Sequence, residues 1–327
     1  MLAVGQNTLT RIVIPIALIA VWGCGIDFSL FHASWGSPGL GLSATAGDSG
    51  ADECIRLGSW SIRGGTVDVQ PDYGAMARAI DDNFDVVGVL ALTRKPGSNP
   101  NYDRLSEKLG EAWAALVTVS PRPNTASAGA SHYAIFYRVG VVRPCQGWQE
   151  LVYHADNDGS GAEEWQDHFR REPAFACFEA GFGAGSAGMD FILALYEAPR
   201  GEAGVGDIAE EASHIHDVFS SMASYRTGER DLIIAGNFNL EADAVYDLAG
   251  VEARSCGHGS TLERRGIRTL DFLDHVLVHD EAATSEMVGC ARPLDLRSVS
   301  DNAAAFVRTI SDHLPIVVLL CSAGDDD

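Results

Sequence analysis

Two short polar stretches, each beside an apolar run, carry the residue types that could do chemistry. Residues 232–235 are apolar, and a glycine then allows a turn that presents the amide side chains of Asn237 and Asn239. Near the C-terminus, Asp312 and His313 precede another apolar run. Strand ends are rigid places to hold a site. Asn239 and Asp312 alone could hold at most a weak, largely hydrated metal ion, and the alternative is an Asn-rich turn without chemistry.

The elements that would position these residues are strands covered by helices. The apolar run before Asn237 suits a strand buried on both faces, and a second strand is expected at 316–320. The glycine-rich stretch 180–188 is expected to be a hairpin or loop between two strands. Two apolar faces have helical spacing; they comprise Leu105, Leu109, Ala112, Trp113 and Leu116, and Ile208, Ile215, Val218, Phe219 and Met222.

The Gly-Asn-Phe-Asn turn at 236–239 and the Ser-Asp-His-Leu-Pro stretch at 311–315 resemble motifs of the endonuclease/exonuclease/phosphatase superfamily, deoxyribonuclease I-like. That family has Gly-Asp-Phe-Asn and Ser-Asp-His-x-Pro at these places. Stretches that look like the family's strands follow in its order at 55–62, 85–92, 133–138, 169–178, 191–199 and 272–279. The resemblance implies an α+β fold, a two-layered β-sandwich flanked by helices (the deoxyribonuclease I-like four-layer α/β sandwich), as one domain at 53–322.

Family members cleave phosphodiesters with a divalent metal ion and two acid–base pairs; the metal neutralises the phosphate, and a His or Asp activates water. The resemblance implies that Asp274 and His313 form the second of these pairs. Asn239 matches the family's second asparagine, and Arg138 matches an arginine near the phosphate.

The family's metal and phosphate positions are substituted in this chain. Its metal-binding glutamate falls on Ala91, whose methyl group offers no ligand, and residues 86–93 contain no acid that a shifted alignment could use. Ser61 replaces an asparagine that helps to hold the phosphate. Asn237 replaces an aspartate, which keeps the shape but removes the charge.

The first acid–base pair is also replaced. Tyr196 falls on the catalytic histidine, and Ser131 on the glutamate that partners it. Tyrosine titrates near ~10, so it does not serve as an acid–base group at neutral pH without a large shift. Glu197 is adjacent, but successive strand side chains face opposite ways, so we do not expect it to stand in for the histidine.

Loss of one member of such a site costs several orders of magnitude in rate. We therefore expect an exported deoxyribonuclease I-like domain that is a non-catalytic (pseudoenzyme) binding or structural module. One alternative is a metal-dependent phosphodiesterase or nuclease with residual or altered chemistry on Asp274 and His313. Another is an ordinary family enzyme whose site aligns differently. No cofactor is expected; Mg²⁺ or Ca²⁺ would bind only under an alternative, with Asp312 as a weak candidate ligand.

The charge of the chain limits its partners. The net charge is −22, with two lysines against 21 arginines. This opposes tight nucleic-acid binding, which needs clustered cations. His132, Arg138, Arg170 and Arg171 are the only hints of a basic rim, and they are as well explained by a solvated edge. The expected partner is an unknown protein or a small phosphate-containing ligand.

The N-terminus predicts targeting out of the cytosol. Arg11 precedes the twelve-residue apolar run 12–23 and Cys24, which is too short for a typical span of ~20 residues. Residues 1–24 are thus expected to be a cleaved signal peptide, a lipid anchor or an uncleaved membrane anchor, so that a membrane tether stays open. Residues 25–52 are expected to be a flexible linker and 323–327 an acidic tail.

Cysteine usage agrees with an extracytoplasmic location. Besides Cys24 there are six cysteines, an even number that suits three disulfides, although buried free thiols are an alternative. Sequence alone does not fix their pairing. The resemblance implies the pairs Cys54–Cys321, Cys145–Cys177 and Cys256–Cys290.

Overall fold

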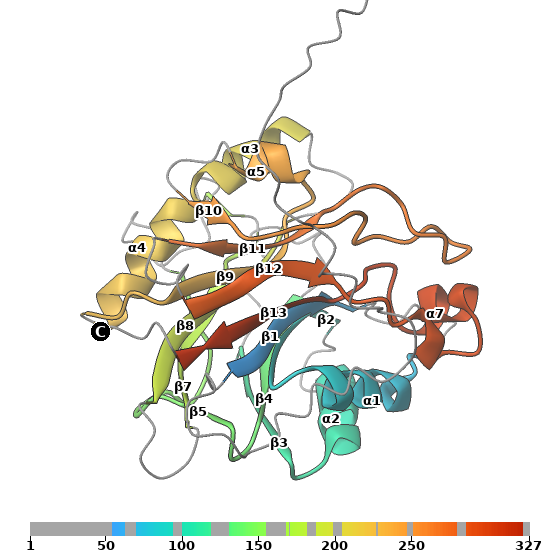
Figure 1. Ribbon diagram of the computed structural model, residues 1–327, viewed down its shortest axis with the longest axis horizontal. Coiled ribbons are helices and arrows are strands. Elements are labelled where there is room, and N and C mark those ends of the chain that lie inside the picture. The colour runs from blue at the N-terminus through green and yellow to red at the C-terminus, as the bar shows by residue number, and fades with distance from the viewer. Residues whose placement is uncertain are drawn as a thin grey trace, which may run out of the picture. The chain divides into compact units, whose positions relative to one another are not determined.

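Two mixed β-sheets pack face to face and carry helices on their outer sides (Figure 1). We describe them from a computed structural model that places residues 54–62, 70–93, 100–118, 131–154, 168–169, 171–181, 188–198, 205–226, 228–246, 251–279 and 286–322. All of these residues lie within one compact unit. The expected N-terminal segments 1–24 and 25–52 and the acidic tail lie outside them.

The first sheet is built around the first and last strands of the described chain. Its strand order is β12 (Met287–Pro293), β13 (Ile316–Cys321), β1 (Cys54–Ser61), β2 (Val86–Thr93), β4 (Ser131–Arg138) and β3 (Trp113–Val117). β1 runs antiparallel to β13 and parallel to β2. The sheet therefore has one end at which β1 and β2 finish and β13 begins.

The second sheet has its own parallel pair at the centre. Its order is β10 (Glu252–Ala253), β11 (Asp274–Val278), β9 (Leu232–Asn237), β8 (Met189–Glu197), β7 (Ala174–Ala180) and β5 (Val142–Pro144), and β6 (Val152–Tyr153) also pairs with β7. β8 and β9 are parallel, and β11 is antiparallel to β9.

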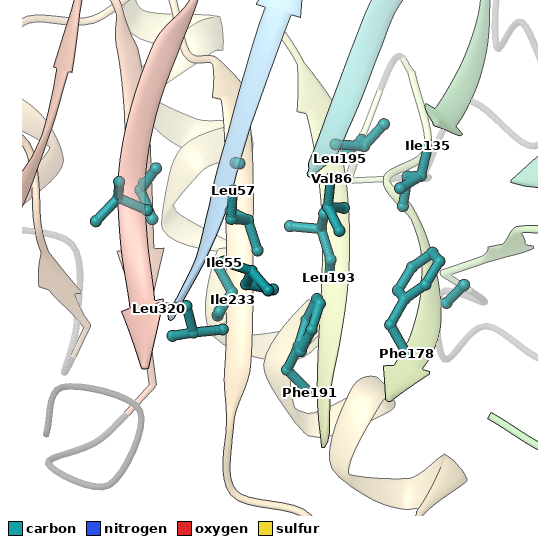
Figure 2. Close-up of a cluster of buried hydrophobic side chains, with 14 of the residues drawn as sticks. Ile55, Leu57, Val86, Ile135, Phe178, Phe191, Leu193, Leu195, Ile233 and Leu320 are labelled. Atoms are coloured by element: carbon teal, nitrogen blue, oxygen red, sulfur yellow. The ribbon is translucent and has the colours of Figure 1, made fainter. Parts of the chain in front are cut away.

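Alternating apolar residues of both sheets form the core between them. Leu57 and Val86 of the first sheet meet Leu193 and Ile233 of the second, and all four are fully buried (Figure 2). Side chains that alternate along a strand face one side of the sheet. The apolar residues on the inner face of each strand therefore fill one layer between the two sheets.

Helices cover the two outer faces. On the first sheet lie α1 (Tyr73–Asn83), α2 (Pro100–Leu109) and α7 (Ala303–Thr309), and on the second lie α3 (Val205–Ser213) and α4 (Ile215–Tyr225) (Figure 1). The remaining short helices are α5 (Ala242–Tyr246) and η2 (Arg297–Val299). The expected sandwich flanked by helices is confirmed.

Two expectations about local structure need correction. The predicted helical face from Leu105 to Leu116 is helix only to Leu109, because Gly110 takes a left-handed φ of 73° and Trp113–Val117 pairs with β4 as a strand. The stretch expected as strand at 169–178 begins its strand only at Ala174. The glycine-rich stretch does connect two antiparallel strands, β7 and β8.

All three disulfides implied by the resemblance are present: Cys54–Cys321, Cys145–Cys177 and Cys256–Cys290. Disulfides are typical of proteins outside reducing compartments. Among the described residues, no helix is long and apolar enough to span a membrane.

Candidate functional site

Three strands of the second sheet place polar residues in one row. β8 and β9 end at Glu197 and Asn237, and β11 begins at Asp274. The strand register pairs Glu197 with Asn237, and Asn237 with Asp274. The row shares its face with Leu195 and Val276, two positions along, which pack in the core between the sheets. Three polar side chains, each at most 2% exposed, therefore lie at one end of that interior layer.

Asp274 forms a closely held pair with His313, which lies just before β13 of the other sheet. His313 Nδ1 and Asp274 Oδ2 are 2.8 Å apart, and the side chains are only 5% and 3% exposed. The backbone N–H of Asp274 donates to Ser260 Oγ at 3.2 Å, and that of His313 donates to Ser311 Oγ at 2.9 Å. The Trp60 indole N–H donates to the His313 carbonyl at 3.1 Å. The structure thus brings together the two residues that the resemblance pairs.

This pair has the arrangement of an oriented base. A carboxylate that accepts from Nδ1–H fixes the ring, and it leaves Nε2 as the nitrogen that can exchange a proton. The hydrogen bonds to the backbone on both sides hold the two side chains in register across the two sheets. The Asp274–His313 pair could therefore support proton transfer to or from a bound molecule.

The turn after β9 is tied to the end of β8. Gly236 is required there, because a Cβ atom would come within 1.9 Å of the Tyr196 carbonyl oxygen. Asn239 adopts a left-handed φ of 52°, its backbone N–H donates to Asn237 Oδ1 at 3.1 Å, and its Nδ2 donates to the Ala198 carbonyl at 3.0 Å. Asn237 Nδ2 is buried and has no hydrogen-bond partner among the described residues.

Apart from His313, the described residues at this end of the first sheet contribute little chemistry. Ser61 is buried at the end of β1, and its carbonyl accepts a hydrogen bond from the Ser311 hydroxyl. Ala91 has a left-handed φ of 60° where the β2–β4 register is irregular, and it is half-buried. Ser131 pairs with Thr93 at the same end.

The described residues at this end of the sandwich do not fit a magnesium or calcium ion of the family type. Such ions take carboxylate, carbonyl and water oxygens. Ala91 offers a methyl group, the Asp274 carboxylate already accepts from His313, and Asn237 turns its oxygen to the backbone of Asn239. Asp312 is half-buried beside His313, and one carboxylate is a poor ligand set.

Tyr196 does not belong to this site, which corrects the expectation from the sequence. It pairs with Gly236, one position before the polar row, and therefore faces the helices. Its hydroxyl donates to Glu211 Oε2 of α3 at 2.9 Å, and its ring packs edge-on against Phe169 and Phe238. Burial, and then the charge of Glu211, raise the pKa of Tyr196 well above its usual value.

Glu197, which was not expected to stand in for the histidine, takes the interior face instead. Its carboxylate is 3% exposed and pairs with Arg171 Nη1 at 3.0 Å. Tyr133 lies across the sandwich, and burial and the charge of Glu197 raise the pKa of Tyr133 well above its usual value. Side chains alternate between the two faces of a strand. Counting this alternation from Asn237 to the paired position on the neighbouring strand would have placed Glu197 on the interior face. No local signal predicts this contact of Arg171, which the sequence offered only as a hint of a basic rim or as part of a solvated edge.

Arg138 is also away from the site. It lies at the opposite end of β4 from Ser131 and pairs there with Asp81 at 3.0 Å and Asp85 at 3.3 Å. Its guanidinium stacks over the Trp113 ring at 4.8 Å. These contacts give it a structural role, at the end of the sheet away from the Asp274–His313 pair.

His132 and Arg170 were the other two hints of a basic rim. His132 is fully buried, and its Nδ1 contacts Thr118 at 3.1 Å. Arg170 lies outside the described residues.

No protein-family model and no curated protein matches this chain, but solved structures do. An endonuclease/exonuclease/phosphatase family protein from Bacteroides thetaiotaomicron matches with a TM-score of 0.55 and 14% identity, over 83% of this chain and 99% of the other. A functionally unknown conserved protein from Enterococcus faecalis matches with a TM-score of 0.58 and 11% identity, over 82% and 100%. A mannosyl-6-phosphatase from Bacteroides thetaiotaomicron matches with a TM-score of 0.54 and 15% identity, over 81% and 99%.

These neighbours and the two stacked sheets define the class of fold, an α/β sandwich with outer helices. It is the fold of the endonuclease/exonuclease/phosphatase superfamily, as the two sequence motifs implied.

Proposed function

We propose that this chain is an exported, non-catalytic binding module that recognises a small phosphate-containing ligand at the row of Glu197, Asn237 and Asp274. The observation that carries the proposal is the free donor of Asn237. Its Oδ1 accepts from the Asn239 backbone, which fixes the orientation of the amide, and its Nδ2 is left buried without a partner among the described residues. A buried donor without an acceptor costs about 1–3 kcal/mol, and a phosphate oxygen would relieve that cost.

Both carboxylates beside this donor already have partners. The Glu197 carboxylate forms an ion pair with Arg171, and that of Asp274 contacts His313. Asp274 lies opposite Asn237 on the neighbouring strand, so the His313 pair and the free donor are close neighbours. One of the structural neighbours is a phosphatase, which supports a phosphate-bearing ligand.

Metal-dependent hydrolysis has weaker support, because the metal-binding carboxylate is replaced by Ala91. The second candidate is a residual hydrolase that uses the Asp274–His313 pair, and the intact 2.8 Å contact favours it. The three disulfides support an exported protein. A membrane tether through the N-terminus is a separate proposal, and phosphate binding does not depend on it.

The test is a calorimetric titration of the purified chain with inorganic phosphate and with mannose 6-phosphate, in EDTA. Asn237→Asp replaces the donor by a carboxylate, so we expect it to weaken binding at least about 10-fold, the equivalent of one lost hydrogen bond. Asn83→Asp is the matched control, since it adds the same charge at the end of α1. Binding should be unchanged in this control.

A parallel assay follows hydrolysis of a generic phosphodiester and of plasmid DNA with Mg²⁺, Ca²⁺ or Mn²⁺. We expect no turnover above that of His313→Ala. Turnover that depends on His313 would establish the residual hydrolase instead. Absence of phosphate binding, or binding that Asn237→Asp leaves intact, would reject the binding proposal.

A further inference from the structure

A group of histidines lies on the outer layer, on the opposite side of the second sheet from the polar row. Four of the chain's ten histidines gather around the start of α4: His154, His168, His214 and His216, together with Asp217. The polar row faces the interior between the sheets, whereas α4 covers the outer face. This group is therefore separate from the site described above.

Three members of the group have possible ligand atoms close together. One ligand atom from each of His168, His214 and Asp217 lies within 4.8 Å of the other two. His214 Nδ1 and Asp217 Oδ2 are 3.2 Å apart, because positions i and i+3 share one face of a helix. The rings of His168 and His214 stack with centroids 3.5 Å apart and planes 12° from parallel.

The donor set favours a transition-metal ion over Mg²⁺ or Ca²⁺. Two imidazole nitrogens and one carboxylate oxygen are typical of zinc, whereas Mg²⁺ and Ca²⁺ take oxygen ligands. We propose that His168, His214 and Asp217 bind one Zn²⁺ ion. Ligand atoms around tetrahedral zinc lie about 3.4 Å apart, so the exposed His168 ring turns out of the stack to bring its nitrogen toward the ion. Three protein ligands leave the fourth position to water.

His216 is a positioning residue for the carboxylate. Its Nδ1 lies 2.8 Å from the Ser213 carbonyl, and its Nε2 lies 3.2 Å from Asp217 Oδ1. Asp217 thus has one oxygen toward His216 and the other toward His214. Outer contacts of this kind orient metal-binding side chains.

The segment that carries His168 is anchored independently of any metal ion. The next residue, Phe169, is fully buried and meets the His154 ring edge-on at 5.5 Å. His154 Nδ1 contacts the Ser221 hydroxyl of α4 at 2.8 Å. These contacts hold the segment against α4, so His168 is near its proposed partners before an ion binds.

The test is a calorimetric titration of the full chain, stripped with EDTA and freed of any histidine tag, with ZnCl₂. We expect one Zn²⁺ per chain and no heat with MgCl₂. His168→Ala, His214→Ala and Asp217→Asn should each weaken Zn²⁺ binding by at least about 10-fold, and His216→Ala by about 10-fold. His258→Ala, an exposed histidine on another part of the surface, is the matched control and should bind as the wild type does.

Two results would overturn the proposal. The first is a wild-type chain that binds no Zn²⁺, which needs no variant to interpret. The second is a His168→Ala variant that retains full affinity, because the binding would then come from the helix surface around His214 and His216 alone. His168 is exposed, so its replacement leaves the fold intact, and urea unfolding in EDTA verifies this.

Discussion

Tyr196→Phe separates a structural tyrosine from a residue of the site. The substitution removes one hydroxyl from a fully buried ring and leaves the contacts with Phe169 and Phe238 in place. The hydroxyl donates to the Glu211 carboxylate at 2.9 Å. Because the pKa of Tyr196 is raised well above its usual value by burial and by Glu211, the hydroxyl keeps its proton at every physiological pH.

The size of the effect follows from that hydrogen bond. Hydrogen bonds to charged groups contribute about 1.5–3 kcal/mol, and Glu211, which is 4% exposed, cannot replace the lost donor with bulk water. We expect the free energy of unfolding to fall by about 2 kcal/mol, with an unchanged dependence on urea concentration. Tyr225→Phe is the control, because that side chain is 52% exposed and should shift stability by less than about 0.5 kcal/mol.

Urea unfolding and the phosphate titration give the two readouts. Tyr196→Phe should lose stability and keep the wild-type affinity for phosphate. Unchanged stability with lost binding would refute the reasoning. It would place the Tyr196 hydroxyl at the polar row, as the resemblance implied, and would contradict the strand facing described here.

The remaining predictions concern stability. The Cys54–Cys321 bridge spans 267 residues and the Cys145–Cys177 bridge 32, so chain entropy predicts losses of about 5.6 and about 3.7 kcal/mol on paired Cys→Ser replacement; urea unfolding that ranks them in reverse order would count against this account. Burial lowers the pKa of His154 from 6.5 to about 4. The unfolded chain therefore takes up a proton first as pH falls, and the free energy of unfolding drops by up to about 3 kcal/mol between pH 6.5 and 4. His154→Asn, measured in EDTA, should lack that drop, and an equal drop in the variant would show that other groups cause it.

The sequence was most informative where apolar runs coincided with the two motifs. The strands ahead of Asn237 and after His313 form as predicted, because an uninterrupted apolar run has few alternatives inside a sandwich. Trp113 and Leu116 failed as helix markers, since their spacing also suits a short strand once Gly110 has ended the helix. Periodicity alone does not separate the two structures.

Site residues were harder to predict than strands. Aligning Tyr196 with a catalytic histidine did not show which face of β8 it occupies, and the register with Gly236 settles that it faces the helices. The approach of His168 to His214 was invisible, because the two lie far apart in the sequence and only the packing of α4 brings them together. Pairings of this kind depend on tertiary structure, which no local pattern encodes.

The Cys54–Cys321 bridge has a mechanical consequence. It joins the first residue of β1 to the last residue of β13, at the end of the first sheet opposite Ser61 and Ala91. A tension applied between the chain before Cys54 and the chain after Cys321 is carried by this one covalent bond and not by the hydrogen bonds of the sheet. The domain is therefore shielded from a pull on its flanks, and both flanks join it at the end of the first sheet farthest from the Asp274–His313 pair.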